Sequence, residues 1–231
     1  MRIMSLPSVF SRYGEGIEAE LKSLILWQNL PLYRLMAYQM GWVDDQGEAV
    51  EVEVGKRIHA TLCLLTCDAL GGDSKEALPA AAALELAHNF SLIHKDIQDG
   101  APERRHRPTV WWLWGPAQGI NAGDGMHALA RLSLLRQTEK GMPPEQALRA
   151  VAILDTACLR LCEGQYLELT YQERLDISLD AYLQMVEGKT AALMSCAAEL
   201  GALMASANEG TMQAMARYGQ KLGLASQIRD D

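Results

Sequence analysis

Apolar and charged positions alternate along most of the chain with the three- and four-residue spacing of an α-helix that buries one face. Between residues 14 and 27, Ile17, Leu21 and Leu24 fall on one face and charged residues fill the other, so the segment predicts an amphipathic packing helix. A polar, acidic stretch over 44–53 interrupts this pattern. The chain is therefore expected to begin with a helix and to pass into a loop before its next apolar segment.

Two longer apolar segments predict buried helices. One runs from 57 to 70 and stops at Gly71-Gly72, since glycine readily ends a helix. The other, over 80–97, follows Pro79, which suits a first helical turn, and contains no internal glycine or proline. The next segment, 100–108, carries two prolines and predicts an irregular loop. This loop holds the densest group of arginines in the chain: Arg104, Arg105 and Arg107.

Downstream of residue 144 the chain contains no proline, and we predict only helices there, separated by breaks at 163–164, 187–188 and 208–210. No strand-like alternation, low-complexity tract or short repeat is evident, and no linker divides the sequence. The pattern therefore predicts an all-α protein with a single helical domain over residues 1–231.

Composition agrees with a helical core. Of the 231 residues, 49% are hydrophobic and 22% charged, which is enough to bury a sizeable core and excludes a disordered or fibrous chain. Aromatic residues make up only 6%, and alanine, leucine and methionine supply most of the apolar volume, as in packed helices. The formal net charge of −8 has the wrong sign for a surface that attracts nucleic acid or anionic lipid. Any bound anion must therefore meet a local cationic pocket.

Cysteine usage bears on the compartment. The chain has five cysteines, an odd number, with no signal peptide and no apolar run long enough to span a bilayer. We therefore expect free thiols and a reducing cytoplasm.

The most informative stretch is 88–110, where carboxylates end an apolar helix and the arginine-rich loop follows. Because residues four apart share a helix face, Lys95 and Asp99 are placed to form an ion pair, and Asp96 points to nearly the same side. Carboxylates so placed suit Mg²⁺, which takes oxygen ligands and bridges to phosphate. Ordinary surface ion pairs explain the same spacing about equally well.

The last residues repeat this arrangement, since carboxylates again follow an apolar helical segment over 222–231. Cationic groups over 55–57 and 188–190 fall where helices are expected to start, and free backbone N–H groups there favour anions. A phosphate-binding P-loop is excluded, because Leu183 stands where its first glycine is needed and no strand precedes it.

In chain order these pieces read GKR, an Asp motif, RR, AGD, GQ, GKT and Q-x-x-DD, and the series resembles the trans-isoprenyl diphosphate synthases, also called polyprenyl synthetases. The resemblance extends from about Tyr13 to Asp231. It implies antiparallel helices around a deep cavity, usually in a homodimer, with two Asp-rich helix ends at the mouth. It also implies that Mg²⁺ bridges these ends to an allylic prenyl diphosphate, whose carbocation is attacked by the double bond of isopentenyl diphosphate.

Matching the motifs position by position assigns candidate residues. The Mg²⁺ ligands would be Asp96, Asp99, Asp230 and Asp231. The residues expected to act in catalysis are Asp96, Asp99, Lys189, Gln227 and Asp230. The pocket for isopentenyl diphosphate would comprise Lys56, Arg57, His59, His88 and Arg105. Around the allylic diphosphate and its tail would lie Arg104, Lys189, Thr190, Gln165 and Phe90. Taken singly, a histidine on an apolar face is more often a core residue and adjacent arginines a solvated loop, but the joint order of the motifs favours a site.

The product length is expected to depend on Phe90. This residue falls five positions before the first Asp motif begins, where its ring would project into the tail cavity. In the family that the sequence resembles, bulk at this position shortens the product. The resemblance thus implies a short- or medium-chain trans-prenyl diphosphate, geranyl to geranylgeranyl in length, although a core aromatic without this effect fits the same position.

The sequence departs from the family pattern at three positions. Lys95 replaces the first aspartate of the first motif, which predicts weak Mg²⁺ binding and slow ionisation; its ammonium either pairs with Asp99 or contacts diphosphate directly. His59 replaces an arginine beside GKR, which makes that pocket less cationic at neutral pH, and Glu168 stands where an aspartate is usual. The sequence also stops inside the second motif, so we expect the helices that normally follow to be lacking.

Two other functions stay open at this point. A terpene synthase of the same fold ionises and cyclises a prenyl diphosphate without a second substrate, and the changes at Lys95 and His59 fit such a protein. A catalytically silent subunit that supports an active partner fits the lost aspartate.

Overall fold

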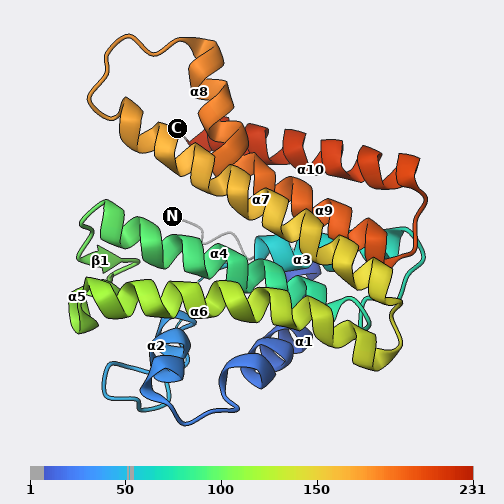
Figure 1. The fold of residues 1–231 in the computed structure, drawn as a ribbon, viewed down its shortest axis with the longest axis horizontal. Helices are drawn as coiled ribbons and strands as arrows, with labels where there is room; N and C mark the ends of the chain where they lie inside the picture. Colours follow the sequence, from blue (N-terminus) through green and yellow to red (C-terminus); the bar gives the residue numbers. More distant parts are fainter. Residues whose placement is uncertain (1–7, 51, 53–54, 231) are drawn as a thin grey trace.

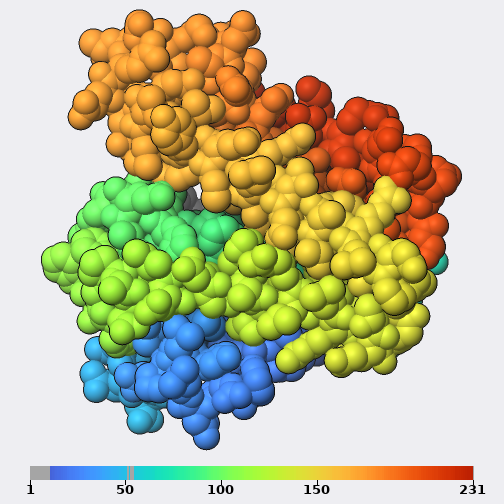
Figure 2. Space-filling model, in the orientation of Figure 1, coloured from blue at the N-terminus to red at the C-terminus, as the bar shows by residue number. Residues whose placement is uncertain are grey.

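Helix α4 (Leu78–Gln98) lies at the centre of the molecule, and the other helices are arranged around it (Figure 1). The computed structural model describes residues 8–50, 52 and 55–230. The N-terminal two thirds of α4 are buried on every side, because four consecutive alanines, Ala80 to Ala83, leave room for neighbours to approach closely. Burial decreases after Phe90, where the helix turns a partly polar face toward a recess. Figure 2 shows this recess between the end of α4, drawn in green, and the orange part of the chain above it.

The regular secondary structure of the described residues is almost entirely helical, as the sequence predicts. The helices are α1 (Ser8–Ile25), α2 (Pro31–Gln39), α3 (Ile58–Ala69), α4, α5 (Val110–Trp114), α6 (Pro116–Leu135), the 3₁₀ helix η1 (Arg136–Lys140), α7 (Pro144–Tyr171), α8 (Leu179–Val186), the π-helix η2 (Glu187–Ala191), α9 (Ala192–Met204) and α10 (Glu209–Asp230). Buried side chains from α1 to α10 form one hydrophobic cluster. None of the described helices is long and apolar enough to cross a membrane.

Two of the predicted helix breaks are wrong. Gly164 lies inside the uninterrupted helix α7, and Gly188 lies in η2, which continues α8 directly into α9. The glycines meet where the two segments cross: a Cβ added at Gly188 would stand 2.9 Å from the Gly164 Cα, and one added at Gly164 would stand 2.2 Å from the Lys189 nitrogen. Glycine is needed here for close approach of two backbones, and not for a helix end. The break expected over 208–210 does fall between α9 and α10.

The same finding corrects the expectation for 188–190. These residues belong to a continuous helical run, so their backbone N–H groups are not the free donors of a helix start. The expectation for 55–57 is confirmed, since Arg57 immediately precedes α3 and takes a left-handed backbone conformation with φ of 49°.

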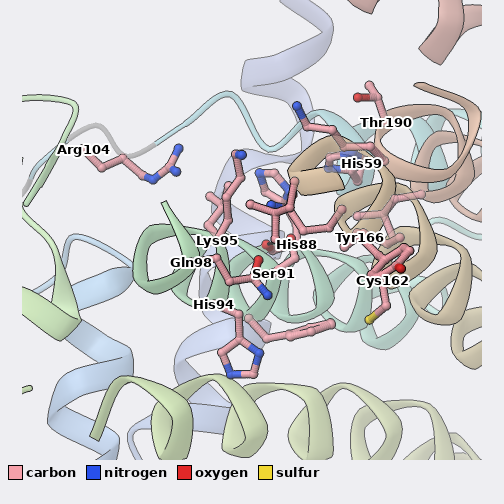
Figure 3. Close-up of a pocket in the computed structure, with 17 residues that line it drawn as sticks. His59, His88, Ser91, His94, Lys95, Gln98, Arg104, Cys162, Tyr166 and Thr190 are labelled. Carbon is pink, nitrogen blue, oxygen red and sulfur yellow. Dashed lines mark hydrogen bonds between the residues drawn. The ribbon is translucent and has the colours of Figure 1, made fainter. Parts of the chain in front are cut away.

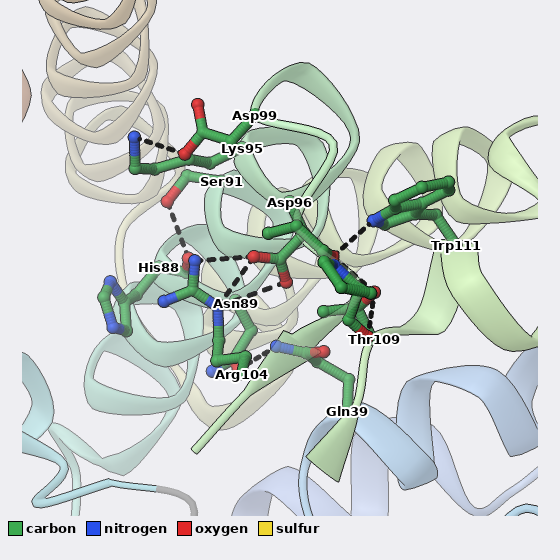
Figure 4. A network of polar contacts seen from close by, with 12 residues as sticks. Gln39, His88, Asn89, Ser91, Lys95, Asp96, Asp99, Arg104, Thr109 and Trp111 are labelled. Atoms are coloured by element: carbon green, nitrogen blue, oxygen red, sulfur yellow. Dashed lines mark hydrogen bonds and ion pairs between the residues drawn. The ribbon is translucent and has the colours of Figure 1, made fainter. Parts of the chain in front are cut away.

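The arginine-rich loop contains a short hairpin that the sequence pattern does not predict. Strands β1 (Glu103–Arg104) and β2 (Arg107–Pro108) pair antiparallel, with Arg104 opposite Arg107. The two turn residues, Arg105 and His106, both have positive φ, the backbone of a tight type I′ hairpin turn. The hairpin holds Arg104 beside the end of α4 (Figure 4).

The close crossing of α7 and η2 predicts how the fold responds to one added methyl group. We expect Gly164→Ala to lower the free energy of unfolding by about 1–3 kcal/mol, because the methyl group meets backbone that cannot move away. Gly14→Ala is the matched control: it also lies inside a helix, but nothing lies within 4 Å of its added Cβ, so a gain of about 0.5–1 kcal/mol is expected. Urea denaturation of both variants measures the difference, and equal stability would contradict the proposed role of the crossing.

Candidate active site

A cavity of about 380 Å³ lies between α4, α7, η2 and α9 (Figure 3). Its inner part is mainly apolar and is lined by Phe90, Leu161, Leu169 and Leu193, with the Gln165 side chain among them. Gln165 is only 8% exposed, and its Nε2 donor finds no partner in the described structure. A buried donor without a partner is costly, so Gln165 is a candidate to donate a hydrogen bond to a water molecule or to a ligand atom in the cavity.

Phe90 lines this cavity and contacts two histidine rings. Its ring centroid lies 4.7 Å from that of His127 on α6 and 5.7 Å from that of His94 on α4. Phe90 is 6% exposed and lines the cavity, so both the tail-pocket and the core interpretations of this residue are compatible with its position.

A second cavity, of about 400 Å³, lies beside the first and gathers the cationic residues expected to bind a diphosphate. The predicted residues that line it are Lys56, Arg57, His59, His88 and Arg105. Segments far apart in the chain, the start of α3, the middle of α4 and the hairpin turn, contribute them. The structure brings these five residues together in one cavity, and their binding of isopentenyl diphosphate stays a prediction.

A buried carboxylate that the sequence reasoning missed holds this pocket in place. Glu85 on α4 is 2% exposed and accepts a hydrogen bond from the Ala60 backbone nitrogen at 3.3 Å. Its Oε2 lies 3.6 Å from Nη1 of Arg57, whose Nε also donates to Glu18 at 2.8 Å. A glutamate inside an otherwise apolar helix is the signal that could have identified it, since such a residue is rarely buried without a cationic partner.

His59 and His88 form the wall between the two cavities, because both residues line both of them. Their ring centroids are 4.7 Å apart. Burial lowers the pKa of His59, and burial together with the nearby His59 and Arg105 lowers the pKa of His88 well below its ordinary value. The wall is therefore uncharged at neutral pH, in agreement with the less cationic pocket predicted from His59.

Asp96 is engaged by the hairpin (Figure 4). Its carboxylate is 2% exposed and accepts hydrogen bonds from Nε of Arg104 at 2.9 and 3.1 Å and from Nη2 at 2.6 Å. Burial raises the pKa of Asp96 although the Arg104 guanidinium acts in the opposite direction. The pair fixes the hairpin against α4, so Asp96 is turned toward a cation of the chain itself.

A network of four charges lies at the mouth of the first cavity. The Lys95 Nζ lies 2.9 Å from Asp99 Oδ2, the predicted ion pair, and also donates to Glu168 Oε2 on α7 at 3.0 Å. Glu168 Oε1 accepts a hydrogen bond of 2.6 Å from Lys189. Partial burial alone would lower the pKa of Lys95, but the bonds to Asp99 and Glu168 outweigh it and leave the pKa raised. Partial burial likewise opposes the fall in the pKa of Glu168, which its two lysine partners produce. Both shifts favour the charged forms of Lys95 and Glu168.

The candidates near the last described residue are only partly brought to the cavity. Gln227 Oε1 accepts a hydrogen bond of 2.8 Å from the Thr190 hydroxyl, which links α10 to η2 at the cavity wall. Asp230 is exposed and lies 2.8 Å from Nη2 of Arg229. Asp231 lies outside the described residues.

Comparison with known proteins agrees with this arrangement. Residues 42–231 match the family model described as polyprenyl synthetase. The chain belongs to this family. It is 43% identical over 197 residues to a (2E,6E)-farnesyl diphosphate synthase of Mycobacterium tuberculosis, an alignment that covers 85% of the chain and 54% of the relative. It is 38% identical over 232 aligned positions to a geranylgeranyl diphosphate synthase of Methanosarcina mazei, covering 100% of the chain and 67% of the relative.

The fold of this polyprenyl synthetase family member is also close to solved structures. A polyprenyl synthetase of Streptomyces coelicolor superimposes with a TM-score of 0.90 at 37% identity, over 97% of this chain and 65% of the other. A geranylgeranyl pyrophosphate synthetase of the archaeon Geoglobus acetivorans gives a TM-score of 0.86 at 33% identity, over 96% of this chain and 69% of the other. The chain spans about half the length of the first curated relatives it matches, 54% for the mycobacterial enzyme.

The carboxylates at the mouth do not fit a divalent cation in this family member. Mg²⁺ prefers an octahedron of oxygen ligands, but Asp96 is bound by Arg104, and Asp99 and Glu168 are bound by Lys95. No group of three or more histidine, cysteine or acidic side chains among the described residues is placed to hold a metal ion. The predicted set of Asp96, Asp99, Asp230 and Asp231 is not assembled in the part of the chain that the structure describes, and it stays a prediction.

Four of the five cysteines lie outside both cavities, and the fifth, Cys162, lines the first one. All five are free, and four of them, Cys63, Cys67, Cys158 and Cys196, are buried. Burial raises the pKa of each of these four, so they remain protonated and pack as small apolar groups. The prediction of free thiols is confirmed.

The buried histidine wall predicts a pH dependence of stability. His88 is neutral in the folded chain but protonates in the unfolded chain near its ordinary pKa of about 6.5, so acid favours unfolding. Its contribution to stability is present above that pKa and is lost as the pH falls through it. We expect a loss of about 1 kcal/mol from His88 between pH 7.5 and 5.5.

Urea denaturation of the natural chain and of His88→Gln over this pH range measures the effect. The variant is expected to show a shallower decline, because it cannot take up the proton in the unfolded state. Parallel declines, or a nuclear magnetic resonance titration that protonates folded His88 at pH 6.5, would contradict the prediction.

Proposed function

We propose that this protein condenses isopentenyl diphosphate with an allylic prenyl diphosphate to form a short- or medium-chain trans-prenyl diphosphate. The supporting observation is the pair of adjacent cavities that share His59, His88 and Leu92. One is small and cationic, and the other is apolar inside with cations at its mouth. Two substrates held in these cavities would meet at their common wall, as a reaction that joins two prenyl units requires. The names of the aligned relatives, farnesyl and geranylgeranyl diphosphate synthase, support the same reaction.

The residues have distinct tasks in this reaction. Lys56 and Arg105 bind the diphosphate of isopentenyl diphosphate in the cationic cavity. Arg104, Lys189 and Thr190 surround the place of the allylic diphosphate, whose C–O bond breaks so that the electron pair leaves with the diphosphate. The double bond of isopentenyl diphosphate then forms the new carbon–carbon bond, and a proton is lost. The uncharged wall of His59 and His88 does not repel the carbocation that forms between the two cavities.

We also propose, from the family to which the chain belongs, that it uses Mg²⁺ and that it forms a dimer with a second copy of itself. Mg²⁺ is the cation that the family suggests to assist departure of diphosphate, with Asp230 and Asp231 of the second motif as its proposed ligands. Asp96 and Asp99 are paired with cations of the chain itself. A homodimer is supported by a stripe of exposed residues on α6, Ile120, Asp124, Leu132 and Leu135, whose spacing places them on one face of the helix. No described feature favours nucleic acid as a partner, in keeping with the net charge of −8. The cytoplasmic location stays a prediction.

An assay with isopentenyl diphosphate and allylic diphosphates of graded length tests the function. Elongated prenyl diphosphates are the expected products. A hydrocarbon or alcohol formed from farnesyl diphosphate alone would favour the terpene synthase, and no turnover without a partner protein would favour the silent subunit.

The separation of the two cavities predicts separate effects on the two substrates. Lys56→Gln and Arg105→Gln are each expected to raise KM for isopentenyl diphosphate about tenfold or more, because each removes a charge-assisted hydrogen bond to the diphosphate. Both variants should change KM for the allylic substrate much less. Lys75→Gln, an exposed lysine outside both cavities, is the control and should leave both values unchanged. Equal increases for the two substrates would contradict the assignment of the cavities.

Phe90 provides a test of product length. Phe90→Ala removes the ring that closes the apolar cavity against His127, so we expect longer products than the natural chain makes. Leu84→Ala is the control, because this residue is fully buried on the same helix but does not line the cavity, and its loss should reduce stability without lengthening products. An unchanged product distribution in Phe90→Ala would identify Phe90 as a core residue only.

A further inference from the structure

Among the described residues, the lining of the apolar cavity includes cations and no carboxylates. Lys95, Arg104 and Lys189 are among the residues that line it, and no aspartate or glutamate is among the described lining residues (Figure 3). The carboxylates nearby, Asp96, Asp99 and Glu168, are each bonded to one of these cations. A ligand that enters the cavity therefore meets nitrogen donors first. This is the lining expected for an anion and not for a divalent cation.

Lys95 occupies the place between two carboxylates where a bridging cation would sit. Its ammonium lies 2.9 Å from Asp99 on α4 and 3.0 Å from Glu168 on α7, so one nitrogen joins the two helices. Lys189 completes the arrangement from the other side of Glu168. Two lysines and two carboxylates give a formal charge of zero, so the group is neutral without any metal ion.

The same lysines retain hydrogen-bond capacity. An ammonium has three donors, of which Lys95 uses two on Asp99 and Glu168 and Lys189 uses one on Glu168. The remaining donors belong to side chains that line the cavity. Asp99 and Glu168 thus position the two ammonium groups, while the donors that are left can bind the oxygens of a phosphate.

We propose that Lys95 takes the place of a divalent cation at the first Asp motif, so that the diphosphate of the allylic substrate is bound at this end directly by Lys95, together with Lys189 and Arg104. No divalent cation then binds between Asp99 and Glu168. The inference rests on the proposed function, since it assigns the mode in which the same site binds its diphosphate. It does not concern the second Asp motif, whose Asp231 lies outside the described residues.

Calorimetric titration with inorganic pyrophosphate tests the proposal without requiring turnover. The natural chain, Lys95→Gln, Lys95→Asp and the control Lys140→Gln, an exposed lysine outside the cavity, are each titrated in EDTA and again in excess Mg²⁺. In EDTA the natural chain and the control are expected to bind pyrophosphate, and both Lys95 variants to bind at least about tenfold more weakly. Mg²⁺ is expected to restore binding to Lys95→Asp, which regains a carboxylate ligand, but not to Lys95→Gln.

Direct counting of bound Mn²⁺ by electron paramagnetic resonance gives an independent measurement. Lys95→Asp is expected to bind one more Mn²⁺ per chain than the natural protein. Lys95→Gln removes the charge and keeps a polar side chain only one atom shorter, so it provides a second variant if Lys95→Asp does not fold.

Two results overturn the inference. If the natural chain binds pyrophosphate only with Mg²⁺ and binds as many Mn²⁺ ions as Lys95→Asp, the lysine does not replace a cation, while the proposed function still stands. If neither the natural chain nor any variant binds pyrophosphate under either condition, the cavity is not a diphosphate site, and both the inference and the proposed function fail.

Discussion

The arrangement of the whole site depends on how tightly α4 can be surrounded. The alanines in its N-terminal half bring neighbouring helices close on every side, and this dense packing fixes the direction in which the helix leaves the core. The middle of the helix carries His88 and its C-terminal third carries Lys95 and Asp96, and along this part a cavity separates α4 from its neighbours. The cavity exists because large side chains replace small ones along one helix. The N-terminal half of α4 thus contributes to the stability of the core, and its C-terminal part lines the candidate binding site.

The local distribution of charge around the site differs from what the net charge of −8 suggests. Carboxylates near the site lie behind cations: Asp96 behind Arg104, and Glu168 behind two lysines. Such an arrangement holds flexible cationic side chains in fixed positions, which lowers the conformational entropy they lose on binding an anion. An acidic protein can therefore present a cationic cavity without a cationic surface.

Short motifs predict many residues of the candidate site because they place these residues on recognisable parts of helices. Lys56, Arg57 and His88 converge as expected, since a helix start and a helix interior are both readable from local pattern. Prediction from local sequence is wrong where tertiary contacts override local preference. The local sequence around Gly164 and Gly188 predicts helix breaks. Each glycine is instead needed because the backbone of the other segment packs closely against it. The bridging role of Glu168 depends on two helices distant in sequence, so no local signal contained it.

The wall formed by His59 and His88 has a consequence for the way this protein can change. Because both rings face two cavities at once, a substitution that enlarges or charges one cavity alters the other in the same step. The two cavities therefore cannot be changed independently at this wall. A substitution that affects only one cavity must lie away from the wall, as Phe90 does in one cavity and Lys56 does in the other.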